Sequence, residues 1–338
     1  MIVVMKPGVE QKHVDHVVEL IKQYGLKHHT IVGTDRTVVA AIGDDRGMDT
    51  SAIENAPMVD EIVPILKPYK VASREIKSEP SVIPIGGGQT IGGRKFGVIA
   101  GPCSVENEKQ IIMTAKDVAK AGAVGLRGGA FKPRTSPYEF QGLGEEGLKL
   151  LAKARDETGL SVCTEVMSID QMDLVAEYAD VLQIGTRNMH NFNLLQAAGK
   201  TGKPVMLKRG WSASLKEFLL AAEYIINEGN QNVILCERGI RTHEQYCRNT
   251  LALGIIPAVK HESHLPIVID PSQGTGHAYM VPSMCKAALA AGADGLLIEV
   301  HPDPEHAMTD GAQSITTESF AKMMDELKRV AEAVDREA

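Results

Sequence analysis

Several features that would restrict function are missing from this chain of 338 residues. Its five cysteines form no Cys-x-x-Cys pair, so reduced thiols in a cytosolic protein are the simplest interpretation. No stretch reaches the roughly 18 uncharged apolar residues that a membrane helix needs. The first residues lack the charged head and long apolar core of a signal peptide. We therefore expect a soluble, cytoplasmic protein that does not bind a membrane.

An excess of positive charge is missing as well. The chain has 36 Lys and Arg against 43 Asp and Glu, a formal net charge of −7, which gives no electrostatic basis for binding nucleic acid. With 43% hydrophobic and 23% charged residues, the composition is that of a folded globular protein rather than a disordered one. The length suffices for one barrel of about 240 residues and a small second domain.

What the chain does contain is eight short apolar runs, each followed by reactive or charged residues. Such a run is typical of a parallel strand buried on both faces, and the segments between the runs show helical periodicity. Eight alternations predict a (β/α)8 barrel, an α/β fold whose active site lies at the carboxyl ends of the strands. The runs are residues 97–104, 124–136, 161–166, 181–188, 204–210, 232–239, 266–273 and 295–302.

Residues 1–70 follow a different pattern. Their predicted order is βαββαβ, that of a ferredoxin-like domain, and their polar residues form no convergent catalytic set, so regulation or assembly is the expected role. The predicted elements are a strand over 2–7, a helix over 9–25, a hairpin over 27–43 that turns near Gly33–Arg36, a helix over 50–56 and a strand over 59–69. Residues 71–95 are expected to be a linker and a hairpin that closes the lower mouth of the barrel, and 96–338 the barrel itself.

Basic residues crowd the predicted strand ends although the whole chain is acidic. Several cations on one rim attract small anions, and Arg offers bidentate geometry for phosphate or carboxylate. The alternative is that these cations are solvated or pair with Glu165, Glu237 and Asp270, but so many on one face favour an anionic substrate. They are Arg127, Lys132, Arg134, Arg187, Lys208, Arg209, Arg238 and Arg241.

Two local sets add chemistry to this rim. The segment 128–138 joins Lys132 and Arg134 to the hydroxyls of Thr135 and Ser136 on a proline-stiffened backbone, which suits a phosphate. At other strand ends, a thiol and two carboxylates, Cys103, Glu299 and Asp310, could bind a borderline divalent ion such as Mn, Fe, Zn or Co. A lone buried Cys is more often a small core residue, so spacing alone leaves this open. We expect His264 to be structural.

Six segments resemble a known family. Residues 101–106, 126–144, 182–189, 207–210, 236–242 and 298–314 resemble 3-deoxy-D-arabino-heptulosonate 7-phosphate (DAHP) synthase, and more closely its type Iβ branch. Residues 1–70 look like the ferredoxin-like (ACT-like) regulatory domain that some members carry. The string Lys-Pro-Arg-Thr-Ser at 132–136 separates the chain from KDO-8-phosphate synthases, which have an Asn-Arg-Ser-Ser version of this loop.

The resemblance implies condensation of phosphoenolpyruvate with erythrose 4-phosphate, the first step of the shikimate pathway, at a divalent metal ion that polarises the aldehyde. For this reaction our own hypothesis is that Lys132 protonates the new alkoxide and that Glu237 orders the attacking water. The implied phosphoenolpyruvate contacts are Arg127, Lys132, Lys208, Arg209, Glu237 and Arg238, and the implied aldose phosphate contacts are Arg134, Thr135 and Ser136. Cys103, Glu299 and Asp310 match three of the four metal-ligand positions.

One position departs from the family. Gln273 stands where the fourth ligand, a histidine, is expected. Three interpretations compete: Gln273 ligates through its oxygen, which favours hard ions such as Mn or Mg; His277 replaces it; or the metal affinity is lost. We favour a retained but weakened site that includes Gln273.

Other functions remain open on the sequence alone. Lys208 could be the nucleophile of a Schiff-base aldolase on the same barrel. KDO-8-phosphate synthesis is a second enzyme alternative, and a metal-poor pseudoenzyme that senses aromatic amino acids is a third. The regulatory domain implies feedback control by tyrosine or phenylalanine, for which His28, His29 and Thr30 are candidate contacts. The family also implies a homo-oligomer, a tetramer.

Overall fold

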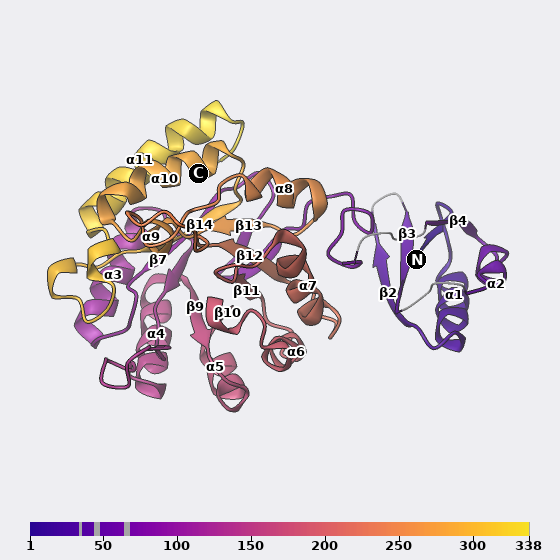
Figure 1. The fold of residues 1–338 in the computed structure, drawn as a ribbon, viewed down its shortest axis with the longest axis horizontal. Helices are drawn as coiled ribbons and strands as arrows, with labels where there is room; N and C mark the ends of the chain where they lie inside the picture. Colours follow the sequence, from indigo (N-terminus) through magenta and orange to yellow (C-terminus); the bar gives the residue numbers. More distant parts are fainter. Residues whose placement is uncertain (34–35, 44–47, 64–67, 338) are drawn as a thin grey trace. The chain divides into compact units, whose positions relative to one another are not determined.

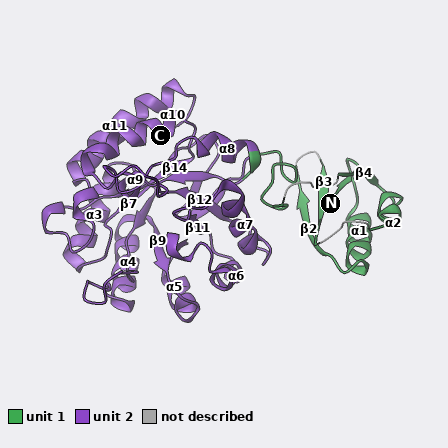
Figure 2. Cartoon of the chain, viewed as in Figure 1, with its two compact units in different colours: residues 1–79, 262–264 green, residues 80–261, 265–338 purple. Residues whose placement is uncertain are grey.

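The computed structural model describes residues 1–33, 36–43, 48–63 and 68–337, and it divides into two compact units (Figure 1). Unit 1 comprises residues 1–79 and 262–264, and unit 2 comprises residues 80–261 and 265–338 (Figure 2). Residues 71–79 therefore pack with the first unit and not as part of a linker. The reason is local: Ile76 is buried in an apolar cluster with Ile2 and Ala40.

Unit 1 has the ferredoxin-like order that the sequence predicts. Its antiparallel sheet has the strand order β2-β3-β1-β4. Residues 34–35 of the expected turn and 64–67 of the expected last strand lie outside the described residues. The elements are β1 (Ile2–Met5), α1 (Gln11–Gln23), β2 (Lys27–Val32), β3 (Thr37–Ile42), α2 (Ser51–Glu54) and β4 (Val59–Val63).

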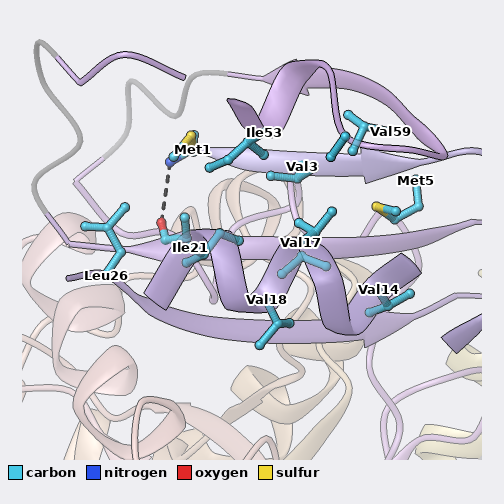
Figure 3. Packing of buried hydrophobic residues seen from close by; sticks show 13 residues of the cluster. Met1, Val3, Met5, Val14, Val17, Val18, Ile21, Leu26, Ile53 and Val59 are labelled. Atoms are coloured by element: carbon cyan, nitrogen blue, oxygen red, sulfur yellow. Dashed lines mark hydrogen bonds between the residues drawn. The ribbon is translucent and has the colours of Figure 1, made fainter. Parts of the chain in front are cut away.

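The core of unit 1 forms where α1 packs on the sheet (Figure 3). Val14, Val17, Val18 and Ile21 recur at helical spacing, so they share one buried face of α1. They contact alternate strand residues such as Val3 in β1, whose neighbours point to the other side of the sheet. Unit 1 therefore has its own hydrophobic core.

Unit 2 contains the barrel, which closes in the strand order β10-β11-β12-β13-β14-β7-β8-β9. Every barrel pair is parallel, and helices surround the strands (Figure 1). The predicted fold is therefore confirmed. The strands are β7 (Gly97–Gly101), β8 (Gly125–Arg127), β9 (Ser161–Val166), β10 (Val181–Ile184), β11 (Val205–Lys208), β12 (Val233–Glu237), β13 (Ile267–Ile269) and β14 (Gly295–Glu299).

Several helices of unit 2 begin at caps that their sequences supply. Asn107 accepts a hydrogen bond at the start of α3, Thr316 does so at the start of α11, and Ser214 forms a capping box with Glu217 in α7. The helices are α3 (Glu108–Lys120), α4 (Glu145–Thr158), α5 (Met172–Tyr178), α6 (Phe192–Lys200), α7 (Leu215–Ile226), α8 (Ile255–Glu262), α9 (Pro271–Thr275), α10 (Val281–Ala290) and α11 (Thr317–Ala333). None of the helices in the described part of the chain has the length and apolar character that crossing a bilayer requires.

A short hairpin precedes the barrel. Its strands are β5 (Ile83–Gly86) and β6 (Gln89–Ile91), and they pair antiparallel. Ile83, Ile85 and Ile91 are buried in one cluster with side chains from the barrel strands, among them Ile99 and Val181. The hairpin thus packs apolar side chains against the barrel, and the charged residues gather at the carboxyl ends of the strands.

Candidate active site

A cavity of about 420 Å³ lies at the carboxyl ends of the barrel strands. Its lining is mostly polar and carries six Lys and Arg residues from the sequence rim together with Arg248. The lining residues are Lys132, Pro133, Arg134, Thr135, Glu139, Glu165, Gln183, Gly185, Thr186, Arg187, Lys208, Trp211, Arg238, Arg241, Arg248, Asn249, Gln273 and Asp310. The expected rim of cations is therefore largely one site, although Arg127 and Arg209 are not in its lining.

Five of the eight rim cations are buried. We call four of them, Arg127, Lys132, Lys208 and Arg238, the buried cations; the fifth, Arg209, is described separately below. Each is at most 8% exposed. Among the described residues, Arg127 Nε and Arg238 Nη1 have no hydrogen-bond partner; Arg127 Nη1 also makes no hydrogen bond, but it forms an ion pair with Glu299. Buried donors are almost always paired, and an unpaired one costs about 1–3 kcal/mol. Arg127 Nε and Arg238 Nη1 are therefore suited to receive an anionic ligand.

The charge of Lys208, one of the buried cations, is compensated by a carboxylate. Its Nζ donates to Asp270 Oδ2 at 2.6 Å. Burial opposes ionisation of Asp270, but Lys208 and Arg127 nevertheless hold the pKa of that carboxyl below its usual value. The alternative that rim cations pair with Asp270 is thus correct for Lys208. An ammonium held by a carboxylate is a poor nucleophile, because the nucleophile of a Schiff base must be the neutral amine.

Arg209 and Glu237 form a second buried pair that does not line the cavity. Arg209 Nη1 donates to Glu237 Oε2 at 2.8 Å, and the other carboxylate oxygen accepts from the Gly239 N–H at 2.6 Å. Both oxygens of Glu237 are therefore occupied, and the carboxylate is completely buried. The structure thus pairs Arg209 with Glu237 outside the cavity lining, and the predicted roles of both residues in the reaction stay predictions.

The expected metal residues come together. The ligand atoms of Cys103, Glu299 and Asp310, which we call the metal group, all lie within 4.8 Å of one another. Cys103 Sγ donates to Asp310 Oδ2 at 3.3 Å, and burial is the main reason that the pKa of the thiol rises to about 11. Asp310 sits at φ +50°, a left-handed conformation that aspartate tolerates at functional sites. One thiol and two carboxylates fit a borderline divalent ion.

Two of the buried cations contact residues of the metal group. Lys132 Nζ donates to the carbonyl oxygen of Cys103 at 2.8 Å and lies 3.1 Å from its Sγ. Arg127 Nη1 lies 3.3 Å from Glu299 Oε1. A ligand bound by these cations would therefore lie beside an ion held by the metal group.

Gln273 does not face the metal group with its oxygen. Its Oε1 accepts from Arg238 Nη2 at 2.9 Å, from Arg238 Nε at 3.2 Å and from Lys208 Nζ at 3.3 Å. Its Nε2 lies 3.5 Å from Glu299 Oε1. Because the oxygen and nitrogen of an amide are assigned by their partners, these cationic donors fix the orientation. The structure thus gives no support to an oxygen ligand at this position.

His277, the expected substitute, is held elsewhere. Its Nε2 lies 3.0 Å from the carbonyl oxygen of Tyr246, and its ring lies 5.3 Å from the Tyr246 ring and 5.6 Å from the Tyr279 ring. It is absent from the metal group found among the described residues. A swing towards the ion would have to break this packing.

The segment that was expected to bind the aldose phosphate is only partly in the cavity. Arg134 and Thr135 line it, and Thr135 Oγ1 accepts from Arg187 Nη2 at 3.3 Å. Ser136 is outside the lining, and its Oγ accepts from the Tyr138 N–H at 3.3 Å. Arg134 Nε is held by Glu139 Oε2 at 2.8 Å.

Some lining residues were not predicted as site residues. Glu165, near the end of β9, was considered only as a partner for cations, yet burial raises its pKa above the usual value despite the opposing effect of Lys132 and Lys208. Gly185 leaves room for it, because a Cβ there would collide with Glu165 Oε1. Arg248 donates to Asp310 Oδ1 at 3.2 Å. Trp211, Gln183 and Asn249 also line the cavity.

His264, His28 and His29 lie outside the cavity lining. His264 is 3% exposed, its Nε2 lies 2.8 Å from the carbonyl oxygen of Val71, and burial lowers its pKa to about 4. The structural interpretation of His264 is therefore confirmed. His28, His29 and Thr30 lie on β2, an edge strand of the unit 1 sheet.

Comparison with known proteins covers both units. A family model described as DAHP synthetase I family matches residues 75–335, and one described as DAHP synthase ferredoxin-like domain matches residues 1–67. A relative from Thermotoga maritima, named phospho-2-dehydro-3-deoxyheptonate aldolase, is 49% identical over 99% of this chain and 98% of its own length. A relative from Koribacter versatilis, named 2-dehydro-3-deoxyphosphooctonate aldolase, is 34% identical over 72% of this chain and 94% of its own.

Solved structures agree with the sequence relatives. The crystal structure of phospho-2-dehydro-3-deoxyheptonate aldolase (DAHP synthase) from Thermotoga maritima matches with a TM-score of 0.79 at 48% identity, over 99% of this chain and 98% of that one. A truncated form of 3-deoxy-D-arabino-heptulosonate 7-phosphate synthase from the same organism matches with a TM-score of 0.75 at 46% identity, over 80% of this chain.

Proposed function

This chain belongs to the DAHP synthetase I family, and we propose that it condenses phosphoenolpyruvate with erythrose 4-phosphate to give DAHP and inorganic phosphate. The observation that carries the proposal is the contact between two features: buried cations with unpaired N–H donors, and a metal group one side chain away. The reaction requires both, because an anionic enol must be held next to an activated aldehyde.

The metal group, Cys103, Glu299 and Asp310, would hold a divalent ion, which supplies Lewis-acid polarisation of the aldehyde when it is bound. Its donor set suits Mn, Fe, Zn or Co, and the choice among them is open. Arg127 and Arg238 would take the carboxylate and phosphate of phosphoenolpyruvate through their unpaired N–H groups. Arg134, Thr135 and Arg187 would hold the phosphate of the aldose at the outer side of the cavity.

Proton transfers follow from the side chains in the cavity. As C3 of phosphoenolpyruvate bonds to the aldehyde carbon, the aldehyde oxygen gains a proton. Lys132 is the donor: burial opposes its charge, but Cys103 and Glu165 raise its pKa overall, so it carries the proton at neutral pH. Water then adds to C2, its proton passes to a base, and the C–O bond of the phosphohemiketal breaks to release phosphate. We assign that base to Glu165, which lines the cavity where Glu237 does not.

Two finer proposals concern unit 1 and assembly. We propose that unit 1 binds tyrosine or phenylalanine as a feedback effector, which the match to a ferredoxin-like domain of this family supports. The candidate contacts remain His28, His29 and Thr30 on β2, an edge strand of the unit 1 sheet. We also propose a cytoplasmic homotetramer. Calorimetric titration with each amino acid and sedimentation of the purified chain test these proposals directly.

The decisive experiment is phosphoenolpyruvate consumption after chelation and re-addition of Mn, Fe, Zn, Co or Mg. With erythrose 4-phosphate we expect turnover that a divalent ion restores. Turnover with arabinose 5-phosphate instead would favour KDO-8-phosphate synthesis, which the 34% identical relative makes worth testing. Borohydride trapping of Lys208 with a keto substrate would favour an imine mechanism. No turnover with any ion, together with binding of an aromatic amino acid, would favour a sensor.

A further inference from the structure

We propose that Gln273 is a positioning residue and not a metal ligand, so that the chain holds its ion with three protein residues only. Cys103, Glu299 and Asp310 would bind the ion, and Gln273 would lie next to it as a bridge between Glu299 and the cations Lys208 and Arg238. The inference rests on the metal dependence proposed above.

The first argument is that the amide oxygen is already committed. Three N–H donors of Arg238 and Lys208 lie within 3.3 Å of Gln273 Oε1. To offer this oxygen to an ion, the amide would have to turn over and place its NH₂ group against those same cations. Hydrogen bonds to charged groups contribute about 1.5–3 kcal/mol each, so this rotation would sacrifice several of them and create donor–donor contacts.

The second argument is that the backbone of Gln273 is held in place. Its N–H donates to Asp270 Oδ1 at 2.9 Å, and its carbonyl oxygen accepts from Asn249 Nδ2 at 2.8 Å. Asp270 is the N-cap of α9 and also binds Lys208. The position of the side chain and the cations that bind its oxygen therefore depend on one network, which opposes a swing of residue 273.

The third argument concerns Glu299. Its Oε2 accepts from Gln313 Nε2 at 2.6 Å, its Oε1 lies 3.3 Å from Arg127 Nη1, and Gln273 Nε2 is 3.5 Å from the same Oε1. An amide N–H beside a carboxylate orients that carboxylate. Gln273 thus acts on the ion through Glu299, and a shell with fewer protein ligands leaves more positions for water or a substrate oxygen.

Co²⁺ binding to the purified full-length chain tests this without turnover. The thiolate of Cys103 gives bound Co²⁺ a charge-transfer absorption, and competition with a chelator gives the Kd. For Gln273→Ala and for Gln273→Met, which keeps the side-chain length, we expect the wild-type spectrum and a Kd within about threefold, but a higher KM for phosphoenolpyruvate because Arg238 and Lys208 lose their acceptor. Gln183→Ala removes a glutamine from the same cavity away from the metal group and serves as the matched control.

For Gln273→His we expect a shifted spectrum and a Kd at least about tenfold lower, because imidazole is a stronger ligand for cobalt than an amide. The inference fails if Gln273→Ala and Gln273→Met weaken Co²⁺ binding more than tenfold while Gln183→Ala does not. A histidine variant with the wild-type spectrum would also overturn it, since residue 273 would then not adjoin the ion. If the wild-type chain takes up no Co²⁺ yet condenses the two substrates, the metal site is wrong and the reaction stands.

Discussion

The two ends of the barrel consist of the same eight strands, yet their chemistry is opposite. At one end the hairpin side chains Ile83, Ile85 and Ile91 complete an apolar cluster with strand residues. At the carboxyl end, five cations are buried with a thiol and several carboxylates, and in the described part of the chain Arg127 Nε and Arg238 Nη1 lack a hydrogen-bond partner. Apolar burial stabilises the fold at about 25 cal/mol per Å², whereas buried charges must be compensated one by one.

The difference indicates that the two ends serve different purposes, one the stability of the fold and the other the reaction. The hairpin end supplies stability without chemistry, and the carboxyl end keeps polar groups in an arrangement that a fold optimised for stability alone would avoid. Substitutions at the two ends should therefore separate stability from activity, and each variant below is expected to change mainly one of the two.

The largest effect is expected for Lys132→Met. This change keeps the buried volume but removes the proposed proton donor and its contact to Cys103, so kcat/KM should fall by about 10³-fold. The free energy of unfolding should fall by no more than about 1–3 kcal/mol, because the lost hydrogen bond to the Cys103 carbonyl oxygen is partly offset by the removal of a buried charge. DAHP formation and urea unfolding measure the two quantities. An activity within tenfold of wild type would show that Lys132 does not act in the reaction.

For Glu237→Gln we expect mainly a loss of stability and not of activity, although this residue also lies at the carboxyl end of the strands. Breaking the pair with Arg209 leaves a buried cation, and we expect a loss of about 3–5 kcal/mol in the free energy of unfolding. The double variant Arg209→Met with Glu237→Gln should recover part of this loss. A stable single variant that has lost turnover would instead return Glu237 to the reaction.

Ile85→Ala tests the apolar end. Truncating this completely buried side chain should lower the free energy of unfolding by about 2–5 kcal/mol, with kcat/KM unchanged well below the unfolding temperature. Val82→Ala is the matched control, since Val82 lies beside the same hairpin but is 49% exposed, and its effect should stay within about 0.5 kcal/mol. An equal effect of the two would contradict the packing role of the hairpin.

The smallest effect is expected at His264, which belongs to neither end. Burial lowers its folded pKa to about 4, so the unfolded chain binds this proton more readily and stability falls as the pH decreases below the unfolded pKa of about 6.5. Between pH 6.5 and 5.5 this linkage amounts to about 1 kcal/mol. His264→Gln should flatten the pH dependence of the free energy of unfolding in this interval; an unchanged slope would assign it to other groups.

The sequence could predict the barrel because strands buried on both faces need continuous apolar runs, and it could predict a cationic site because strand ends converge. It could not separate Arg209 from Lys208, since adjacent residues at a strand end point to different sides and only the paired strands decide which partner each meets. For Glu237, too, only the arrangement of the paired strands decides which partner the side chain meets. Arg248 lies in a segment without strand or helix periodicity, so no local signal identified it.

The orientation of Gln273 shows a further limit. Its residue type permitted an oxygen ligand, and only the positions of Lys208 at the end of β11 and Arg238 just after β12 show that the oxygen is already bound. Residues 71–79 were expected to belong to a linker because the stretch 71–95 holds charges, prolines and many glycines, but the apolar contacts of Ile76 join them to unit 1. In both cases long-range packing decided what local composition left open.

The most direct test of the central claim is the affinity of the metal-free chain for phosphoenolpyruvate, measured by calorimetry for wild type and Arg238→Met. The unpaired, buried Nη1 of Arg238 predicts that the variant binds about 10- to 100-fold more weakly, because it loses a charge-assisted hydrogen bond worth about 1.5–3 kcal/mol. Equal affinities in a folded variant would show that the buried cations do not hold the anion, and would contradict the account.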